Sequence, residues 1–125
     1  MFLAVGEHLL ERIDPQSQRM TNLFAGGLGG SHEEMCGALA GAILAMSALL
    51  GRTDCHTDDK DAMALAKRYR ELFLAELGHT QCAPLREWAR GPQGTGSCRP
   101  LVERAATILL QLLEPHQGEL QWIDK

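Results

Sequence analysis

Two short phrases of the sequence, CAPL at residues 82–85 and CRPL at residues 98–101, place a cysteine two residues before a proline. Proline is tolerated in the first turn of a helix, because its missing N–H would be unpaired there in any case. Pro84 and Pro100 therefore predict two helix starts, with Cys82 and Cys98 at or just inside the helix N-termini. Unpaired N–H groups and the positive end of the helix dipole favour a thiolate at such positions.

Capping residues and histidines near the cysteines extend these candidate sites. Thr80 and Ser97 precede the two predicted helix starts and could cap them. His79 stands three residues before Cys82, and His32 stands four residues before Cys36. On a helix, the second spacing places thiol and imidazole on one face, where they can share a metal or a proton. We expect Cys36 in the second turn of a central helix, where the helix dipole is weaker.

The fourth cysteine belongs to a polar loop. Asp54, Cys55, His56, Asp58 and Asp59 form a potential ligand cluster, although a solvated turn explains the same residues. A structural reading also stays open for the other cysteines, because a free cysteine often serves as a small buried apolar residue. His8, between apolar neighbours, is interpreted as structural.

The spacing of the four cysteines excludes several common sites. The 125-residue chain contains neither CxxC nor CxxCH, which removes zinc ribbons, thioredoxin-like motifs and c-type haem attachment. The N-terminus lacks the basic region of a signal peptide, so we expect a cytoplasmic protein, in which disulfides are not the default. The cysteines are then thiols, metal ligands or redox groups.

A glycine-rich stretch precedes Cys36. Gly26, Gly27, Gly29 and Gly30 fall within six residues, but no Walker lysine or GxGxxG spacing accompanies them, so nucleotide binding is not favoured. Glycine lets backbone approach other groups closely. The stretch is expected either to let the helix of Cys36 pack tightly on neighbouring backbone or to leave room for a cofactor.

The pattern of apolar residues predicts helices throughout. Apolar residues make up 45 % of the chain, while valine and isoleucine are scarce. Helical periodicity predicts helices over residues 2–13, 16–24, 32–50, 59–77, 84–89 and 99–114. Ser31 and Glu34 have the spacing of a capping box for the third helix. We therefore expect an all-α, compact single-domain bundle of five or six helices around an apolar, Gly/Ala-rich central helix.

The ends of the chain carry further expectations. The domain is assigned to residues 1–114 and the tail to residues 115–125, from which Leu120, Trp122 and Ile123 could dock on the body. The first helix opens on apolar residues without a capping residue, as if its first turn were missing, which predicts that the natural domain, or its ancestor, extends upstream.

Charge and hydropathy bear on partners. The net charge is −4 and no basic patch with interleaved aromatic residues occurs, so a nucleic-acid partner is not expected. The uncharged run over residues 35–51 indicates a buried helix rather than membrane insertion. Its glycine and alanine faces would suit a homo-oligomer, such as a homodimer.

Three segments together, FAGGLGGSHEEMCGALAGAI, FLAELGHTQCAPL and SCRPLVERAATIL, resemble the C_GCAxxG_C_C family of small helical proteins. The resemblance covers about residues 2–113. The core signature CGAxxG is present at residues 36–41, and Cys82 and Cys98 match the two later cysteines. The family's first cysteine, expected in or just before the first helix, has no counterpart, and Cys55 lies outside the pattern. The resemblance implies redox activity that depends on these cysteines.

Three functions remain open. Cys36, Cys82 and Cys98 could hold an iron–sulfur cluster or a single thiophilic metal, with His32, Cys55, solvent or a second chain as the fourth ligand. Two of the cysteines could instead cycle between dithiol and disulfide without a metal. A structural homo-oligomer with packing cysteines is the third hypothesis. No paired carboxylates, nucleophile elbow or complete triad can be assigned, so a hydrolase is not favoured.

Overall fold

The structure, a computed structural model, describes residues 1–116. Helices make up most of this part of the chain, and the prediction of an all-α bundle is confirmed. In chain order they are α1 (Phe2–Leu9), α2 (Pro15–Asn22), α3 (Gly37–Leu50), α4 (Lys60–Leu77), α5 (Cys82–Arg90), α6 (Arg99–Leu113) and the short 3₁₀ helix η1 (Glu114–His116). Residues 1–116 contain no helix with the length and apolar character that a membrane span requires.

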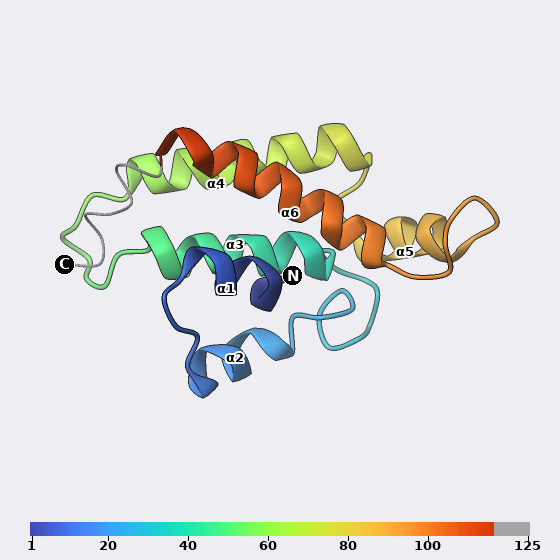
Figure 1. Cartoon of the computed structure of the whole chain (residues 1–125), viewed down its shortest axis with the longest axis horizontal. Helices are drawn as coiled ribbons and strands as arrows, with labels where there is room; N and C mark the ends of the chain where they lie inside the picture. Colours follow the sequence, from blue (N-terminus) through green and yellow to red (C-terminus); the bar gives the residue numbers. More distant parts are fainter. Residues whose placement is uncertain (117–125) are drawn as a thin grey trace.

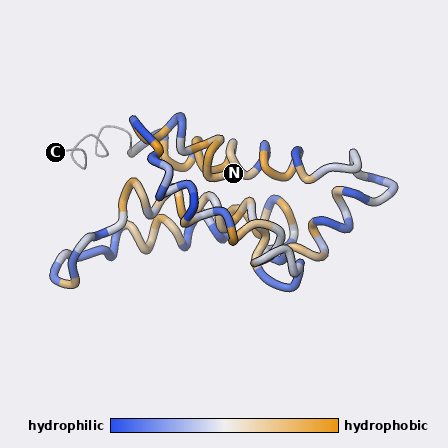
Figure 2. Tube along the Cα trace, turned by 90° about the horizontal axis from the view of Figure 1, so that it is seen from below, coloured by the Kyte–Doolittle hydropathy of each residue, from blue (hydrophilic) through white to orange (hydrophobic). Residues whose placement is uncertain are grey.

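Helix α3 lies in the middle of the bundle. It packs against α1, α4 and α6, and α5 extends the bundle beyond the beginning of α6 (Figure 1). No residue of α3 is charged, and Ala42 and Ala45 are fully buried. The loop that joins α3 to α4 is almost entirely hydrophilic (Figure 2). The apolar residues of five helices, α1, α3, α4, α5 and α6, therefore form one core, and the charged side chains of residues 1–116 lie outside it.

Two aromatic residues anchor α4 in this core. Tyr69 and Phe73 are fully buried, with ring centroids 6.2 Å apart. The Tyr69 hydroxyl donates a hydrogen bond of 2.9 Å to the carbonyl oxygen of Ala105 in α6. This bond gives the buried phenol a partner and fixes α4 relative to α6.

Several helix ends differ from the prediction. Helix α1 stops at Leu9 rather than at residue 13, because the chain turns into the N-cap of α2, where the Asp14 side chain accepts from the N–H of Ser17 at 2.8 Å. Helix α2 ends at Asn22 and has no buried residue. Met20 and Leu23 are accordingly exposed. At the end of α4, Gly78 adopts φ +82°, as its predicted role as a terminator requires.

The largest correction concerns the start of the central helix, which begins at Gly37 and not at residue 32. Residues 26–30 form a left-handed turn, with φ of 63° at Gly26, 71° at Leu28 and 70° at Gly30. Ser31 serves this turn rather than a helix: its hydroxyl donates to the carbonyl of Gly27 at 2.7 Å. The predicted capping box is therefore wrong.

Some expectations fall on the end of the chain. The predicted docking of Leu120, Trp122 and Ile123 lies outside the described residues. Residues 114–116 continue α6 as η1, so the described part of the tail begins as helix.

Candidate functional site

Three cysteines lie at three helix N-termini. Cys82 is the first residue of α5 and Cys98 is the N-cap of α6, as Pro84 and Pro100 predicted. Cys36 is the N-cap of α3, so its predicted place in the second turn of that helix is wrong. Since Cys36 stands before the helix, all three thiols share one kind of backbone environment.

The three thiols line a single pocket with a volume of about 340 Å³. Cys36 and Cys82 are 8 % and 7 % exposed, and Cys98 is partly buried. The other walls come from α1, α2 and the segment after it, α3, and α6. They comprise Met1, Phe2, Leu3, Thr21, Asn22, Phe24, Ala25, Gly26, Gly37, Ala38, Gly41, Leu101 and Val102. The pocket is thus a mostly apolar space with three sulfur atoms on its surface.

Backbone hydrogen bonds set the positions of Cys36 and Cys82. Met35 and Gln81 form an isolated antiparallel bridge. On either side of it, the N–H of Cys36 donates to Thr80 and the N–H of Cys82 donates to Glu34, each at 2.8 Å. Side chains alternate along extended backbone, so both cysteines point to one side of the bridge. Met35 and Gln81 are exposed on the other side.

This bridge explains why the helix cannot start earlier. The N–H of Cys36 already has a partner in the loop after α4, and the left-handed turn supplies no helical residues before it. Thr80 therefore contributes its carbonyl oxygen rather than the predicted side-chain cap. Ser97 does accept from the N–H of Arg99, at 3.2 Å, beside Cys98.

The left-handed turn covers Cys82. A Cβ atom added to Gly27 would lie 2.6 Å from the Cβ of Cys82 and 2.8 Å from the Cα of His32. Gly27 is buried and has φ +70°. The turn therefore needs glycine here both for its backbone conformation and for its close approach to the thiol.

The glycines of the CGAxxG segment serve the same pocket. A Cβ on Gly37 would meet the backbone of Ala25 at 3.4 Å, and one on Gly41 would meet the backbone N of Phe2 at 2.9 Å. Gly37 and Gly41 are four residues apart and therefore share a face of α3. That face lets the glycine-rich turn and the beginning of α1 approach α3 beside Cys36.

Burial dominates the electrostatics of the thiols. Desolvation raises the pKa of Cys36, while the N–H groups of Ala38 and Leu39 lower it and the charge of Cys98 raises it further. Desolvation also raises the pKa of Cys82, followed by the charges of Cys36 and Cys98, and Arg86 opposes these effects. Both thiols are therefore neutral near pH 7, and ionising one of them disfavours ionising the next.

Several predicted site residues do not belong to this pocket. His32 has φ +61° and precedes α3, so it does not share a helix face with Cys36. His79 is exposed. Neither histidine lines the cysteine pocket. The predicted pairing of each histidine with a cysteine is therefore not supported by the geometry.

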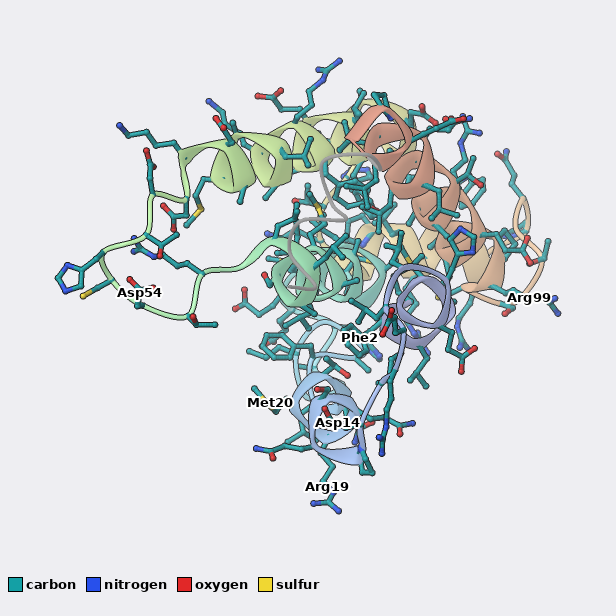
Figure 3. The ribbon with its side chains drawn as sticks, turned by 60° about the vertical axis from the view of Figure 1, so that its left-hand side comes forward. Phe2, Asp14, Arg19, Met20, Asp54 and Arg99 are labelled. Carbon is teal, nitrogen blue, oxygen red and sulfur yellow. The ribbon has the colours of Figure 1, made fainter. Side chains whose placement is uncertain are left out.

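Cys55 is exposed in the loop between α3 and α4. Asp54 accepts hydrogen bonds there from the N–H groups of His56 and Thr57, at 2.8 and 2.9 Å, which makes the segment a solvated turn. Figure 3 shows Asp54 in a loop that extends away from the helices, whereas Phe2 lies at the beginning of α1. Across residues 1–116, no group of three His, Cys, Asp or Glu side chains stands close enough to hold a metal as placed.

Sequence reasoning missed the contributions of α1 and α2 to the pocket. Thr21 and Asn22 line the pocket although α2 has no buried residue. No local sequence pattern predicts that these two residues lie at the pocket. Leu101 could have been anticipated, because it follows Pro100 in the first turn of α6.

The comparisons with known proteins give one result. The family model described as "Putative redox-active protein (C_GCAxxG_C_C)" matches residues 1–112. The searches of curated proteins and of solved structures found no match. Since the model covers most of the chain, the resemblance seen in the sequence is confirmed. The chain belongs to the C_GCAxxG_C_C family.

Proposed function

We propose that the pocket is a redox centre in which Cys36, Cys82 and Cys98 bind an iron–sulfur cluster or a single soft metal ion. The observation that carries the proposal is the convergence of three thiols, from segments far apart in the sequence, on one pocket. Thiolates are the preferred ligands of iron–sulfur clusters, Zn²⁺ and Cu⁺. When bound, an iron–sulfur cluster supplies one-electron transfer.

The raised pKa values of the thiols favour metal binding over metal-free disulfide exchange. A catalytic thiol that exchanges disulfides needs a low pKa, whereas burial raises the pKa of Cys36 and of Cys82. A metal ion displaces the protons of the thiols when it binds, because cysteines bind metal ions as thiolates. We therefore expect binding to release protons and to stabilise thiolates that burial disfavours.

The surroundings suit an anionic sulfur site. Ala38 and Leu39 direct backbone N–H groups towards the sulfur of Cys36, which stabilises its thiolate form. Gly26, Gly37 and Gly41 line the pocket without side chains, and most of the other lining residues are apolar. Because the thiols do not already form a metal-holding group, binding requires their side chains to draw together.

A second candidate function is thiol–disulfide exchange between Cys36 and Cys82. The bridge at Met35 and Gln81 makes these residues diagonal neighbours on one side of the paired backbone. Diagonal neighbours have Cα atoms about 7–8 Å apart, compared with the 4.4–6.8 Å usual for a disulfide. Oxidation would therefore require the two segments to move closer.

Metal analysis of the wild-type chain tests both candidates. The protein is purified without oxygen, reconstituted with iron and sulfide or with Zn²⁺ or Cu⁺, and examined for bound metal, acid-labile sulfide and absorption. Replacing any of the three pocket cysteines by Ser should abolish stoichiometric binding. Cys55→Ser is the matched control and should bind as the wild type does.

Two results would decide against the cluster or metal. Failure of the folded wild-type chain to bind any of the offered metals would overturn the proposal. A Cys36–Cys82 disulfide that forms in mild oxidant and reverses in reductant, mapped by mass spectrometry, would then favour the second candidate.

A further inference from the structure

Two shallow apolar grooves meet on one side of α3. The first has a volume of about 310 Å³ and lies between the left-handed turn and α3; the second, of about 240 Å³, lies between the end of α3 and the start of α4. Ile43 lines both. We call this continuous surface the Ile43 face. Its apolar residues include Phe24, Leu28, Met35, Ile43, Leu44 and Met63.

The composition of α3 indicates that this face is buried in the functional state of the protein. A helix that is apolar on all sides is normally buried on all sides. Helices α1, α4 and α6 cover the other sides of α3. Ile43 and Leu44 nevertheless remain only partly buried, and both line the first groove.

Leu28 supplies an independent observation. It has φ +71° in the left-handed turn, where an L-residue other than glycine is disfavoured by about 1–2 kcal/mol. Its side chain is 52 % exposed and lines the first groove. Four glycines surround it, so a fifth would relieve the strain. An exposed leucine that retains backbone strain does not serve stability, so the strain points to a function of this residue other than stabilising the fold.

The polar groups at the edge of the face leave little net charge. Arg52 and Asp59 form an ion pair of 3.2 Å at the end of the second groove. Glu34 lines the first groove. The face therefore offers apolar contact rather than a charged surface for a highly charged partner.

The size of the apolar surface matches one half of a dimer interface. Phe24, Leu28, Met35 and Met63 are 42 %, 52 %, 48 % and 64 % exposed. At roughly 200 Å² for a large apolar residue, they expose about 400 Å², and half-buried neighbours add to this. In a standard interface each partner buries about 800 Å², of which about 60 %, or roughly 500 Å², is apolar.

We infer that the Ile43 face binds a second copy of this chain. A two-fold interface brings the same patch of both copies together, so an apolar face meets an equally apolar face. Ala40 and Ser47, which also line the grooves, are small enough to let two α3 helices approach closely. Phe24 lines both this face and the cysteine pocket, so the dimer would hold one wall of the pocket in place.

Sedimentation equilibrium of the full chain, over a concentration series with reductant, tests the inference. The wild type should dimerise. Met63→Lys should raise the dissociation constant roughly 10- to 100-fold, because it places a charge in a desolvated contact. Leu74→Lys is the matched control, since Leu74 is an exposed leucine of the same helix outside both grooves. It should dimerise as the wild type does.

Leu28→Gly separates association from folding. Glycine relieves the left-handed strain, so the melting temperature of the monomer at low concentration should rise, while the dissociation constant of the dimer should increase about tenfold. A wild-type chain that remains monomeric throughout the series would overturn the inference. So would unchanged dimerisation in both Met63→Lys and Leu28→Gly.

Discussion

The backbones of Cys36 and Cys82 are joined on either side of one antiparallel bridge. The N–H of Cys36 donates a hydrogen bond to the carbonyl oxygen of Thr80, and the N–H of Cys82 donates one to the carbonyl oxygen of Glu34, both at 2.8 Å. The positions of the two cysteines therefore depend on main-chain bonds rather than on contacts of their sulfur atoms. Substituting either thiol by Ser should leave this frame in place, which makes such variants suitable for isolating the chemistry of the pocket.

Alanine substitutions in the glycine-rich turn should cost more stability at Gly27 than at Gly29. At Gly27 an added Cβ would lie 2.6 Å from the Cβ of Cys82, and the residue has φ +70°. We expect Gly27→Ala to lower the free energy of unfolding by about 3 kcal/mol, from left-handed strain and overpacking together. Gly29→Ala has the same sign of φ, but nothing lies within 4 Å of its added Cβ, so about 1 kcal/mol is expected.

Urea unfolding under reducing conditions measures both variants. Equal losses for Gly27→Ala and Gly29→Ala would show that the turn does not press on Cys82 as described. The rate at which an alkylating reagent labels Cys82 gives a second readout, and it should increase in Gly27→Ala alone.

Gly41 is predicted to set the distance between α3 and α1. An added Cβ would stand 2.7 Å from the Cβ of Met1 and 2.9 Å from the backbone N of Phe2. Alanine gains up to about 1 kcal/mol of helix propensity, but overpacking against backbone costs about 1–3 kcal/mol. We expect a net loss of about 1–2 kcal/mol in thermal or urea unfolding, and faster labelling of the pocket thiols as α1 moves outwards.

Gly6→Ala is the control for Gly41→Ala. Its added Cβ would come within 2.7 Å of the Cδ1 atom of Ile13, which is the movable end of a side chain. Helix propensity should then decide the result, and Gly6→Ala should be neutral or stabilising. A stable Gly41→Ala with unchanged thiol labelling would contradict the role assigned to Gly41.

Local rules predicted much of the fold. Proline at residues 84 and 100 indicated two helix starts, and Gly78 indicated a helix end, because each constraint acts on the backbone of its own neighbourhood. The apolar periodicity of α4 and α6 likewise reflects faces that enter the core, whereas the apolar character of α3 on all sides indicates its central place. These features require no knowledge of distant residues.

The site could be predicted only in part. Cys36, Cys82 and Cys98 were recognised as candidates, but their shared pocket depends on contacts between distant segments. The false helix over residues 32–36 has the same cause: a hydrogen bond from Cys36 to Thr80 competes with helix formation, and no local pattern reveals it. Thr21 and Asn22, at the end of α2, likewise line the pocket through the packing of segments that are distant from the cysteines in the sequence.

Alkaline pH should destabilise the protein through the pocket thiols. Burial raises the pKa of Cys36 and of Cys82 from an ordinary value of 9.0. Above about pH 9 the unfolded chain therefore binds fewer protons than the folded one, and the free energy of unfolding decreases as pH rises. This stabilising contribution is complete below about pH 9 and is lost as pH rises through the folded pKa values, at up to about 1.4 kcal/mol per pH unit for each thiol.

Urea titrations between pH 7 and 10.5 with reductant check this dependence. The Cys36→Ala/Cys82→Ala double variant should show a shallower decline from pH 9, whereas Cys55→Ala should follow the wild type. Burial of Tyr69 also raises its pKa, so a decline of the same sign, beginning near pH 10, should persist in the double variant. Parallel curves for wild type and double variant would disprove the contribution of the thiols.

A fourth thiol introduced in α1 should strengthen metal binding. Leu3 lines the cysteine pocket from the beginning of α1, the part of the chain where the family pattern has its first cysteine. Leu3 is 42 % exposed and does not belong to the hydrophobic core, so Leu3→Cys should cost less stability than a core substitution. A fourth soft ligand completes the tetrahedral set that Zn²⁺ and iron–sulfur clusters prefer.

For Leu3→Cys, we expect the dissociation constant for Zn²⁺ to fall at least tenfold relative to wild type, as measured by competition with a chromophoric chelator. Trp88 is 54 % exposed on α5 and does not line the pocket, so Trp88→Cys should leave the constant unchanged. Equal effects of the two substitutions would mean that added sulfur binds Zn²⁺ on its own, without the three pocket thiols.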